Sequence, residues 1–227
     1  MKRKVTMLSA LILSLTLASA GISTANAQEV SHEEQNQVEN VNAAAYRGNV
    51  YLTFDDGPNN ATSNTLVNNL KNAGCYQATF FVWGSKIQSN QWAWNVYLNS
   101  GFSLQNHSWS HAYMNNWNYQ QVYNDFQRCN QVIQNAGKPR PTKVRLPYLY
   151  SNQTIRQACS ALRLSIVTPT VYTNDWNGAS TNAIISSCYN LQAGGNPLMH
   201  DSYQNTVNAI PAIVKNLKNQ GFGFAQY

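Results

Sequence analysis

The chain has 227 residues, of which 15 are Lys or Arg and 9 are Asp or Glu, so that only 11% are charged. After the basic residues 2–4, the Lys and Arg residues are scattered and form no cluster, which argues against a nucleic-acid partner. Its unusual content is 13 Tyr and 6 Trp among many Asn and Gln. Because amides hydrogen-bond to hydroxyl groups and aromatic faces stack on sugar rings, this composition favours a neutral, hydroxyl-rich ligand.

Residues 1–27 have the three parts of a secretory signal peptide. A basic start at residues 2–4 precedes an apolar run over residues 8–20 and an Ala-Asn-Ala cleavage pattern at residues 25–27. The apolar run is too short for a comfortable membrane span. We therefore expect cleavage near Gln28, a secreted extracellular protein, and no membrane attachment after cleavage.

Residues 28–45 are polar and acidic and contain no aromatic side chain. Such a stretch cannot bury enough apolar surface to fold, so we expect a disordered tether there. One domain is expected over residues 46–227, because removal of the signal leaves about 200 residues, the size of a single domain. This domain is expected to be a monomer.

From Tyr46 onward, short apolar strands alternate with helical patterns. Alternating side chains with Gly or Pro stops predict strands, and apolar residues three and four apart predict helices. The predicted strands are 49–54, 78–83, 101–106, 143–148, 165–170, 196–200 and 221–224, and the predicted helices are 61–72, 91–99, 119–136, 153–161, 181–189 and 206–219. The alternation predicts an α/β fold with parallel strands, in either an open sheet or a barrel.

Two carboxylates, Asp55 and Asp56, end the first predicted strand and precede a Gly-Pro stop. The C-terminal ends of strands are where β/α folds place their chemistry. Because neighbouring strand residues point to opposite faces, we expect different roles, with one acid holding a metal and the other acting on what the metal binds. Taken alone, Asp-Asp-Gly is also typical of a solvated turn.

Two histidines, His107 and His111, follow the third predicted strand at a spacing of four residues. If the turn there is helical, both imidazoles face the same way at the spacing of metal ligands. Together with a strand-end Asp they would form a set of two His and one carboxylate, which leaves positions open for water and substrate. Zn²⁺, Co²⁺ and Ni²⁺ all accept this set, with Zn²⁺ the first expectation.

The four cysteines are far apart and contain no Cys-x-x-Cys pair, which argues against a zinc knuckle. Export permits up to two disulfides among Cys75, Cys129, Cys159 and Cys188, with three possible connectivities. Three of them, Cys129, Cys159 and Cys188, also fall in amphipathic helical patterns. Buried free thiols are therefore the alternative.

Five short motifs occur in order: TFDDGP at 53–58, HSWSH at 107–111, RLPY at 145–148, DW at 175–176 and LMH at 198–200. With these motifs the chain resembles the NodB-homology polysaccharide deacetylases, the fourth family of carbohydrate esterases, from Gly48 to about Gly221. Within that family it is most similar to the bacterial acetylxylan esterases. The resemblance implies a distorted (β/α) barrel of fewer than eight strands, with the site at the C-terminal ends of the strands.

The same resemblance implies a metal centre with a base beside it. Asp56, His107 and His111 would hold one divalent metal ion, which polarises an acetyl carbonyl and acidifies water. Asp55 would be the base that takes a proton from that water. Arg145 would pair with Asp55 and keep it ionised and oriented.

The remaining motif residues are implied to act on the intermediate and the leaving group. The backbone N–H of Tyr148 would meet the developing oxyanion. His200, oriented by Asp175, would protonate the leaving sugar oxygen or amine. Trp176 and Leu198 would form apolar walls around the acetyl methyl group, in a slot that rejects bulkier acyl groups.

One position departs from the family pattern, because Leu149 and Tyr150 follow the RLPY motif where many members have Gly. This departure predicts a different loop shape beside the oxyanion donor. Aromatic residues near the ends of motifs, Tyr113, Trp117, Tyr150 and Tyr172, are candidate platforms for sugar rings.

The predicted function is hydrolysis of acetyl groups on a polysaccharide, with O-acetyl xylan as the first substrate. Polymers of N-acetylglucosamine, in chitin or peptidoglycan, are the alternative, because the same metal site handles amides. A non-catalytic carbohydrate-binding module would need neither Asp55 nor His200, so the presence of both argues against such a module. A non-haem iron oxygenase would be expected in an all-β jelly roll, and a serine esterase would need a Gly-x-Ser-x-Gly elbow.

Overall fold

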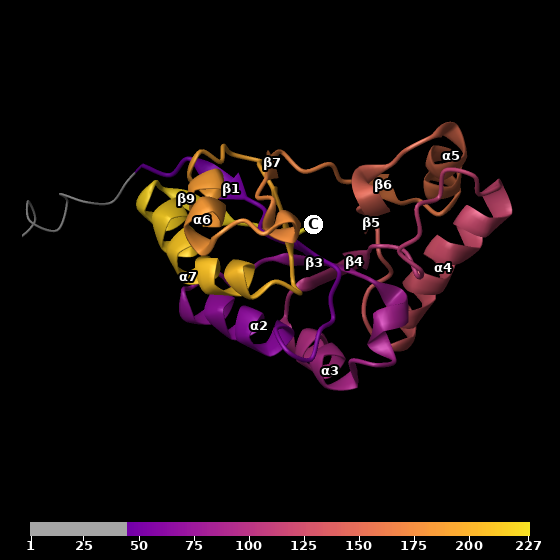
Figure 1. Cartoon of the computed structure of the whole chain (residues 1–227), viewed down its shortest axis with the longest axis horizontal. Helices are drawn as coiled ribbons and strands as arrows, with labels where there is room; N and C mark the ends of the chain where they lie inside the picture. The colour runs from indigo at the N-terminus through magenta and orange to yellow at the C-terminus, as the bar shows by residue number, and fades with distance from the viewer. Residues whose placement is uncertain (1–44) are drawn as a thin grey trace, which may run out of the picture. The chain divides into compact units, whose positions relative to one another are not determined.

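The computed structural model describes residues 45–227, so the predicted signal peptide and the predicted tether up to residue 44 lie outside the described residues. Seven parallel strands form one curled sheet in the order β6-β5-β4-β3-β2-β8-β7. This sheet has two edges, β6 and β7, and is therefore an incomplete barrel (Figure 1). The prediction of a distorted α/β barrel with fewer than eight strands is confirmed.

The strands are short. The main sheet contains β2 (Thr53–Asp55), β3 (Thr79–Val82), β4 (Ser103–Asn106), β5 (Lys143–Val144), β6 (Ser165–Ile166), β7 (Val171–Tyr172) and β8 (Pro197–His200). A separate parallel pair joins β1 (Gly48–Val50) to β9 (Phe222–Phe224). The last strand of the described chain therefore returns beside the first.

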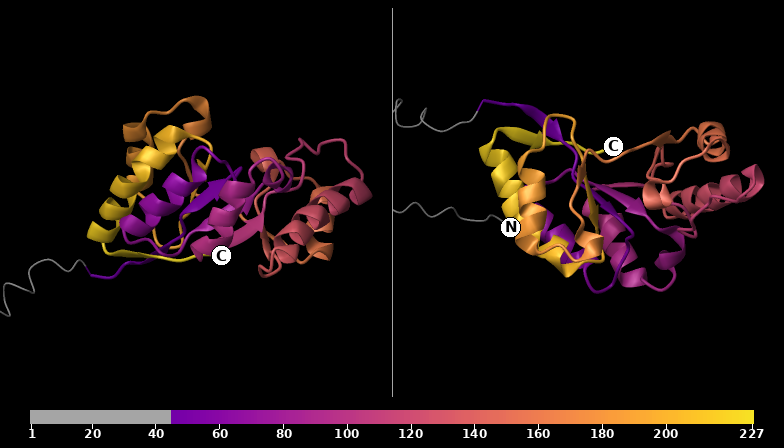
Figure 2. Two further views of the ribbon diagram at one scale, coloured as in Figure 1. Left: turned by 90° about the horizontal axis from the view of Figure 1, so that it is seen from below. Right: turned by 45° about the horizontal axis from the view of Figure 1, so that its top comes forward.

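Six α-helices accompany these strands in the described residues. They are α2 (Ser63–Asn72), α3 (Gln91–Ser100), α4 (Tyr119–Asn135), α5 (Gln153–Ala161), α6 (Thr181–Tyr189) and α7 (Gln204–Asn219), and each coincides with a predicted helix to within two residues at either end. Helices α2, α6 and α7 lie side by side at one end of the domain and α4 and α5 at the other (Figures 1 and 2). Of the helices in the described part of the chain, none has the length and apolarity to cross a membrane.

Three of the predicted strands were wrong in extent. The run 49–54 is divided between β1, which pairs with β9, and β2, which pairs with β3 and β8. The predictions 143–148 and 165–170 shrink to two residues each. Pro147 and Pro169 lie in the lost parts, and proline has no N–H to donate to a strand ladder. Because β7 follows β6 without a helix between them, the predicted alternation also breaks there.

The main hydrophobic core lies between the sheet and the helices α2, α3 and α7. Phe54 of β2 stacks on Phe80 of β3 at 5.3 Å between ring centroids, and Phe80 in turn contacts Tyr97 of α3 at 4.4 Å. Burial of each Phe side chain stabilises the fold by roughly 1.5–3 kcal/mol. A second cluster under α4 and α5 is centred on Phe126 and Leu162.

The four cysteines belong to these cores and are buried free thiols, so the disulfide expectation was wrong and the alternative is confirmed. Burial raises the pKa of each thiol to about 12. Each thiol is therefore protonated and unreactive at neutral pH.

The opposite face of the central strands carries a buried cation in place of an apolar core. Arg145, which follows β5, is fully buried, and its guanidinium carbon lies 4.5 Å from the centre of the Phe81 ring. Its Nη1 donates to Thr53 Oγ1 at 2.8 Å and to Asp55 Oδ1 at 3.0 Å, and its Nη2 donates to Asn196 Oδ1 at 2.6 Å. A buried ion pair is tolerated when its polar groups are bonded in this way.

Replacement of Arg145 tests this arrangement. Arg145→Met would leave the Asp55 carboxylate buried without its cation, so we expect the free energy of unfolding to fall by about 3–5 kcal/mol. Urea denaturation followed by tryptophan fluorescence measures the change. Arg156→Met, at an exposed position of α5, is the matched control and should stay within about 0.5 kcal/mol of wild type. Equal losses in the two variants would contradict a specific role for the buried pair.

Candidate metal centre and catalytic site

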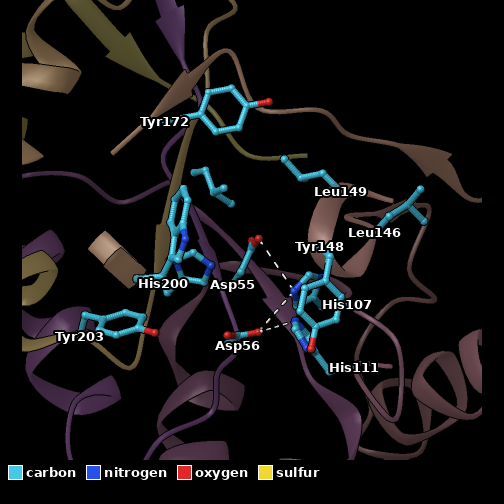
Figure 3. A pocket seen from close by; sticks show the side chains of 12 residues that line it. Asp55, Asp56, His107, His111, Leu146, Tyr148, Leu149, Tyr172, His200 and Tyr203 are labelled. Carbon is cyan, nitrogen blue, oxygen red and sulfur yellow. Dashed lines mark ion pairs between the residues drawn. The ribbon is translucent and has the colours of Figure 1, made fainter. Parts of the chain in front are cut away.

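A cavity of about 410 Å³ lies at the C-terminal ends of β2, β7 and β8 and beside the loops after β4 and β5 (Figure 3). The structure places eight of the ten predicted site residues on its wall and the other two, Arg145 and Asp175, buried behind it. The lining residues are Asp55, Asp56, His107, His111, Leu146, Tyr148, Leu149, Tyr172, Trp176, Leu198, His200 and Tyr203.

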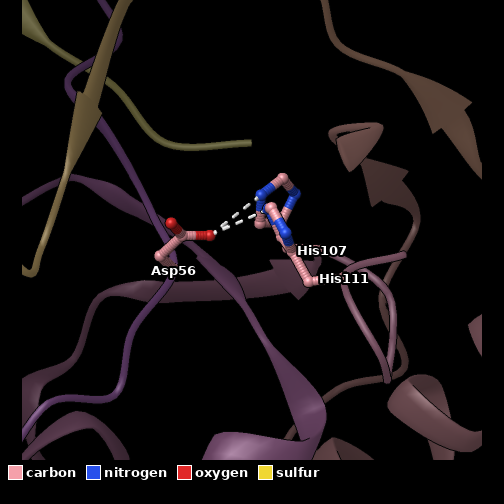
Figure 4. A group of neighbouring side chains, drawn as sticks. All are labelled: Asp56, His107 and His111. Carbon is pink, nitrogen blue, oxygen red and sulfur yellow. Dashed lines mark ion pairs between the residues drawn. The ribbon is translucent and has the colours of Figure 1, made fainter. Parts of the chain in front are cut away.

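Asp56, His107 and His111 converge on one point of the cavity wall (Figure 4). Asp56 Oδ1 lies 3.3 Å from His107 Nε2 and 3.1 Å from His111 Nε2. Burial raises the pKa of Asp56, but the two imidazoles outweigh it, so the pKa falls well below its ordinary value. Oδ1 is nevertheless buried without a hydrogen bond of good geometry. A carboxylate oxygen and two imidazole nitrogens in this arrangement fit a divalent cation.

The orientation of His107 is set by its other ring nitrogen. Nδ1 lies 2.7 Å from the carbonyl oxygen of Arg145. Because a carbonyl only accepts, Nδ1 carries a proton, and in the neutral ring Nε2 has the lone pair on the side of Asp56, as a metal ligand requires. Burial alone would lower the pKa of His107, but the neighbouring Asp55 and Asp56 outweigh this effect and raise the pKa above its ordinary value. The local charges therefore favour a cation at this point.

The two histidines converge without a helical turn, which corrects the predicted reason for their proximity. Residues 107–111 form an irregular loop in which Ser108 and His111 have positive φ, at 68° and 53°. The Ser108 N–H donates to Asn106 Oδ1 at 2.7 Å, and the His111 N–H donates to Ser108 Oγ at 2.8 Å. These short-range bonds hold the loop in a conformation that spacing alone does not reveal.

Asp125 supports the same loop and was missed by the sequence analysis. From α4, its Oδ1 accepts the Trp109 N–H at 2.8 Å and its Oδ2 accepts the Ser110 N–H at 3.2 Å. Burial raises the pKa of Asp125 above its ordinary value. The sequence contains one signal for this role, because Asp125 lies beside the apolar positions Val122 and Phe126 of a predicted helix, on the face expected to be buried.

Asp55 lies beside the candidate metal ligands but is held separately. Its Oδ1 accepts the bond from Arg145, whereas Oδ2 lies 3.9 Å from His107 Nε2 on the cavity wall (Figure 3). One oxygen is thus fixed and the other is available to a water molecule in the cavity. Thr53 and Asn196 share the Arg145 guanidinium, and neither contact was predicted: Thr53 lies in the TFDDGP motif but was given no role, and Asn196 lies outside the motifs.

His200 and Asp175 form a second pair on the other side of Asp55. Strand register places His200 of β8 directly beside Asp55 of β2. Asp175 Oδ1 lies 2.8 Å from His200 Nδ1, and its Oδ2 accepts the His200 N–H and the Thr206 hydroxyl, each at 2.7 Å. Burial alone would lower the pKa of His200, but the Asp175 contact raises it above the ordinary value. Burial likewise opposes ionisation of Asp175, and the bonds from His200 lower its pKa.

The cavity rim combines an unusual turn with apolar walls. Tyr148 has a positive φ of 56° in the turn Pro147–Leu149. The turn is closed by the N–H groups of Leu149 and Tyr150, which donate to the carbonyl groups of Leu146 and Pro147. The Tyr148 side chain is 64% exposed at the rim. Leu198 is buried, while Trp176 is half-exposed with its ring centroid 5.7 Å from that of His200.

The candidate sugar platforms separate into two groups. Tyr172 lines the cavity, and exposed Tyr113 extends the aromatic surface beyond it with its ring centroid 4.7 Å from that of Tyr150. Trp117 and Tyr150 instead pack in part against the second hydrophobic cluster. Tyr203, which was not predicted, lines the cavity with its ring 5.8 Å from His200.

Known proteins are similar in sequence to this chain over most of the described domain. Residues 43–167 match the family model described as polysaccharide deacetylase. A bifunctional xylanase/xylan deacetylase of Cellvibrio japonicus is 47% identical over 77% of this chain and 26% of the relative. A peptidoglycan-N-acetylmuramic acid deacetylase of Bacillus subtilis is 32% identical over 76% of this chain and 36% of the relative. The chain thus spans about a quarter to a third of the length of these relatives.

Solved structures agree on the fold. A family 4 carbohydrate esterase from Streptomyces lividans, in complex with acetate, has a TM-score of 0.75 and 36% identity over 79% of this chain and 93% of its own. A family 4 acetyl xylan esterase from Clostridium thermocellum, in complex with a cobalt ion, has a TM-score of 0.71 and 28% identity over 78% and 87% of the two chains. The chain therefore belongs to the polysaccharide deacetylase family, the NodB-homology carbohydrate esterases of family 4.

Proposed function

We propose that this chain is a secreted, metal-dependent polysaccharide deacetylase that removes O-acetyl groups from xylan. The observation that carries the proposal is the convergence of Asp56, His107 and His111 beside Asp55 and His200 in one cavity. The 47% identity to a xylan deacetylase favours xylan, and the signal-like residues 1–27 favour export. The low share of charged residues, 11%, and the many amide and aromatic side chains suit the same ligand.

Asp55 is suited to be the base. A divalent cation held by Asp56, His107 and His111 would polarise the acetyl carbonyl and lower the pKa of water. Asp55 Oδ2 would accept a proton from the attacking water, while Arg145 holds Oδ1 at 3.0 Å and fixes the carboxylate. The base therefore acts from a defined position. As the carbonyl oxygen gains charge, the Tyr148 N–H at the rim would donate to it.

His200 is suited to be the acid. Its Nδ1 is bonded to Asp175, which leaves Nε2 to donate a proton to the sugar oxygen as the acetyl carbon–oxygen bond breaks. The pKa of His200, raised by Asp175, keeps the ring protonated at a higher pH than an unperturbed histidine. Leu198 and Trp176, which also line the cavity, would surround the acetyl methyl group and disfavour longer acyl chains.

An N-acetyl substrate is the second candidate. The 32% identity to a peptidoglycan deacetylase favours it, although that relative is less similar than the xylan deacetylase. The same base and acid serve an amide, because His200 would then protonate a leaving amine.

Acetate release tests the proposal. Purified protein should release acetate from acetylated xylan faster than from N-acetylglucosamine oligomers, lose this activity on chelation and regain it with Zn²⁺ or Co²⁺. Asp55→Ala should keep the cation but lose about 10²–10⁴-fold in kcat. His107→Ala should lose both activity and cation, because it removes a ligand. Acetate release and bound metal are measured on the same samples.

Three outcomes would redirect the assignment. Release from the amide substrate alone would favour the peptidoglycan or chitin deacetylases. Release that persists after proven removal of the metal would contradict a metal-dependent reaction. An Asp55→Ala variant with a rate near wild type would contradict the role of Asp55 as base.

The pH dependence tests the His200–Asp175 pair. A general acid must be protonated, so activity should fall as pH rises through the pKa of His200. Because Asp175 raises this pKa, Asp175→Asn should lower it and move the basic limb of the kcat/KM profile to lower pH. Circular dichroism verifies that the variant is folded. An unmoved basic limb in a folded variant would show that His200 is not the titrating acid.

A further inference from the structure

The loop that carries Asp56 has a hydrogen-bond donor at each of three successive carbonyl groups. The Asp201 N–H donates to the Asp55 carbonyl at 3.0 Å, Lys86 Nζ donates to the Asp56 carbonyl at 3.1 Å, and the Trp83 N–H donates to the Gly57 carbonyl at 2.9 Å. Two of these donors are backbone groups. Lys86, in the turn Gly84–Ile87, supplies the one that is a side chain.

Asp56 requires such support because its backbone is in an unfavourable conformation. Its φ of 69° lies in the left-handed region, which residues with a side chain adopt only rarely. The conformation is the one in which the carboxylate meets His107 and His111 at 3.3 and 3.1 Å (Figure 4). The bond from the Lys86 ammonium to the Asp56 carbonyl stabilises this orientation.

The segment around Lys86 also contacts the loop that carries the two histidines. The Gly84 N–H donates to the Ser108 carbonyl and the Ser85 N–H to the Trp109 carbonyl, each at 3.0 Å. A Cβ on Gly84 would come within 2.8 Å of the Trp109 ring, so the two segments are closely packed.

Trp83 links Lys86 to the second histidine ligand. The Trp83 ring stacks on the His111 ring at 4.5 Å between centroids, and Lys86 Nζ lies 4.2 Å from the centre of the Trp83 ring. A cation is attracted to the face of an indole ring, and this attraction restrains the position of the ring. One ammonium group thus contacts the backbone of Asp56 and the ring that packs against His111.

We infer that Lys86 is a positioning residue for the cation site, acting through Asp56 and through the Trp83 ring on His111. The inference rests on the proposed metal-dependent function. The inference also predicts the direction in which cation affinity changes when Lys86 is removed. If the charge of Lys86 acted only by repulsion, its removal would strengthen cation binding; if Lys86 positions the ligands, its removal weakens cation binding.

Lys86→Met tests the inference, because methionine keeps an apolar stem over Trp83 but has no ammonium group. With Zn²⁺ or Co²⁺ as the probe in competition with a chromogenic chelator, we expect roughly tenfold weaker binding than in the wild type. Lys86→Arg keeps the charge and the donors and should recover most of this loss. The matched control is Lys71→Met, because Lys71 also lies over an aromatic ring, Phe102 at 5.8 Å, but on α2. It should bind the cation as the wild type does.

The outcomes separate this inference from the proposed function. Wild-type protein that binds neither cation would overturn both. Wild-type binding with unchanged or tighter binding in Lys86→Met would overturn the positioning role alone. A lower melting temperature of metal-free Lys86→Met without a change in cation affinity would show a purely structural lysine, and would also overturn it.

Discussion

The buried Arg145 is the residue on which both halves of the site depend. Its guanidinium fixes Asp55 through a 3.0 Å bond, and its backbone carbonyl accepts the Nδ1 proton of His107 at 2.7 Å. One residue therefore orients the candidate base with its side chain and a candidate metal ligand with its main chain. The guanidinium carries five N–H donors, which explains how it can bond Asp55, Thr53 and Asn196 together in a buried position.

The sheet turns this local arrangement into a reaction centre. Parallel strands end at one edge, and register places Asp55 of β2 beside His200 of β8. At this edge Arg145 pairs with the Asp55 carboxylate, whereas Asp175 raises the pKa of the His200 imidazole above its ordinary value. The candidate base and the candidate acid therefore line one cavity, beside Asp56 as a candidate metal ligand.

Local sequence patterns were sufficient for the helices and the fold class, and the ordered motifs indicated which residues share the cavity. The same patterns could not predict the two-residue strands, because an alternation with a period of two cannot be recognised in two residues. The positive φ values of Ser108 and His111 leave no trace in their spacing. The residues that support the site from other segments of the chain were also missed: Asn196, Asp125 and Lys86. Such contacts become visible only once the chain is folded. The roles of the motif residues remain predictions.

The most direct test of this account is the position of the cation. Crystals grown with Co²⁺ or Zn²⁺ and measured at the absorption edge of the metal would locate it by anomalous scattering. The account predicts one strong peak among Asp56 Oδ1 and the Nε2 atoms of His107 and His111, with Asp55 still paired to Arg145. A peak on Asp55, or on ligands outside this group, would contradict the assignment of Asp55 as base and Asp56 as metal ligand.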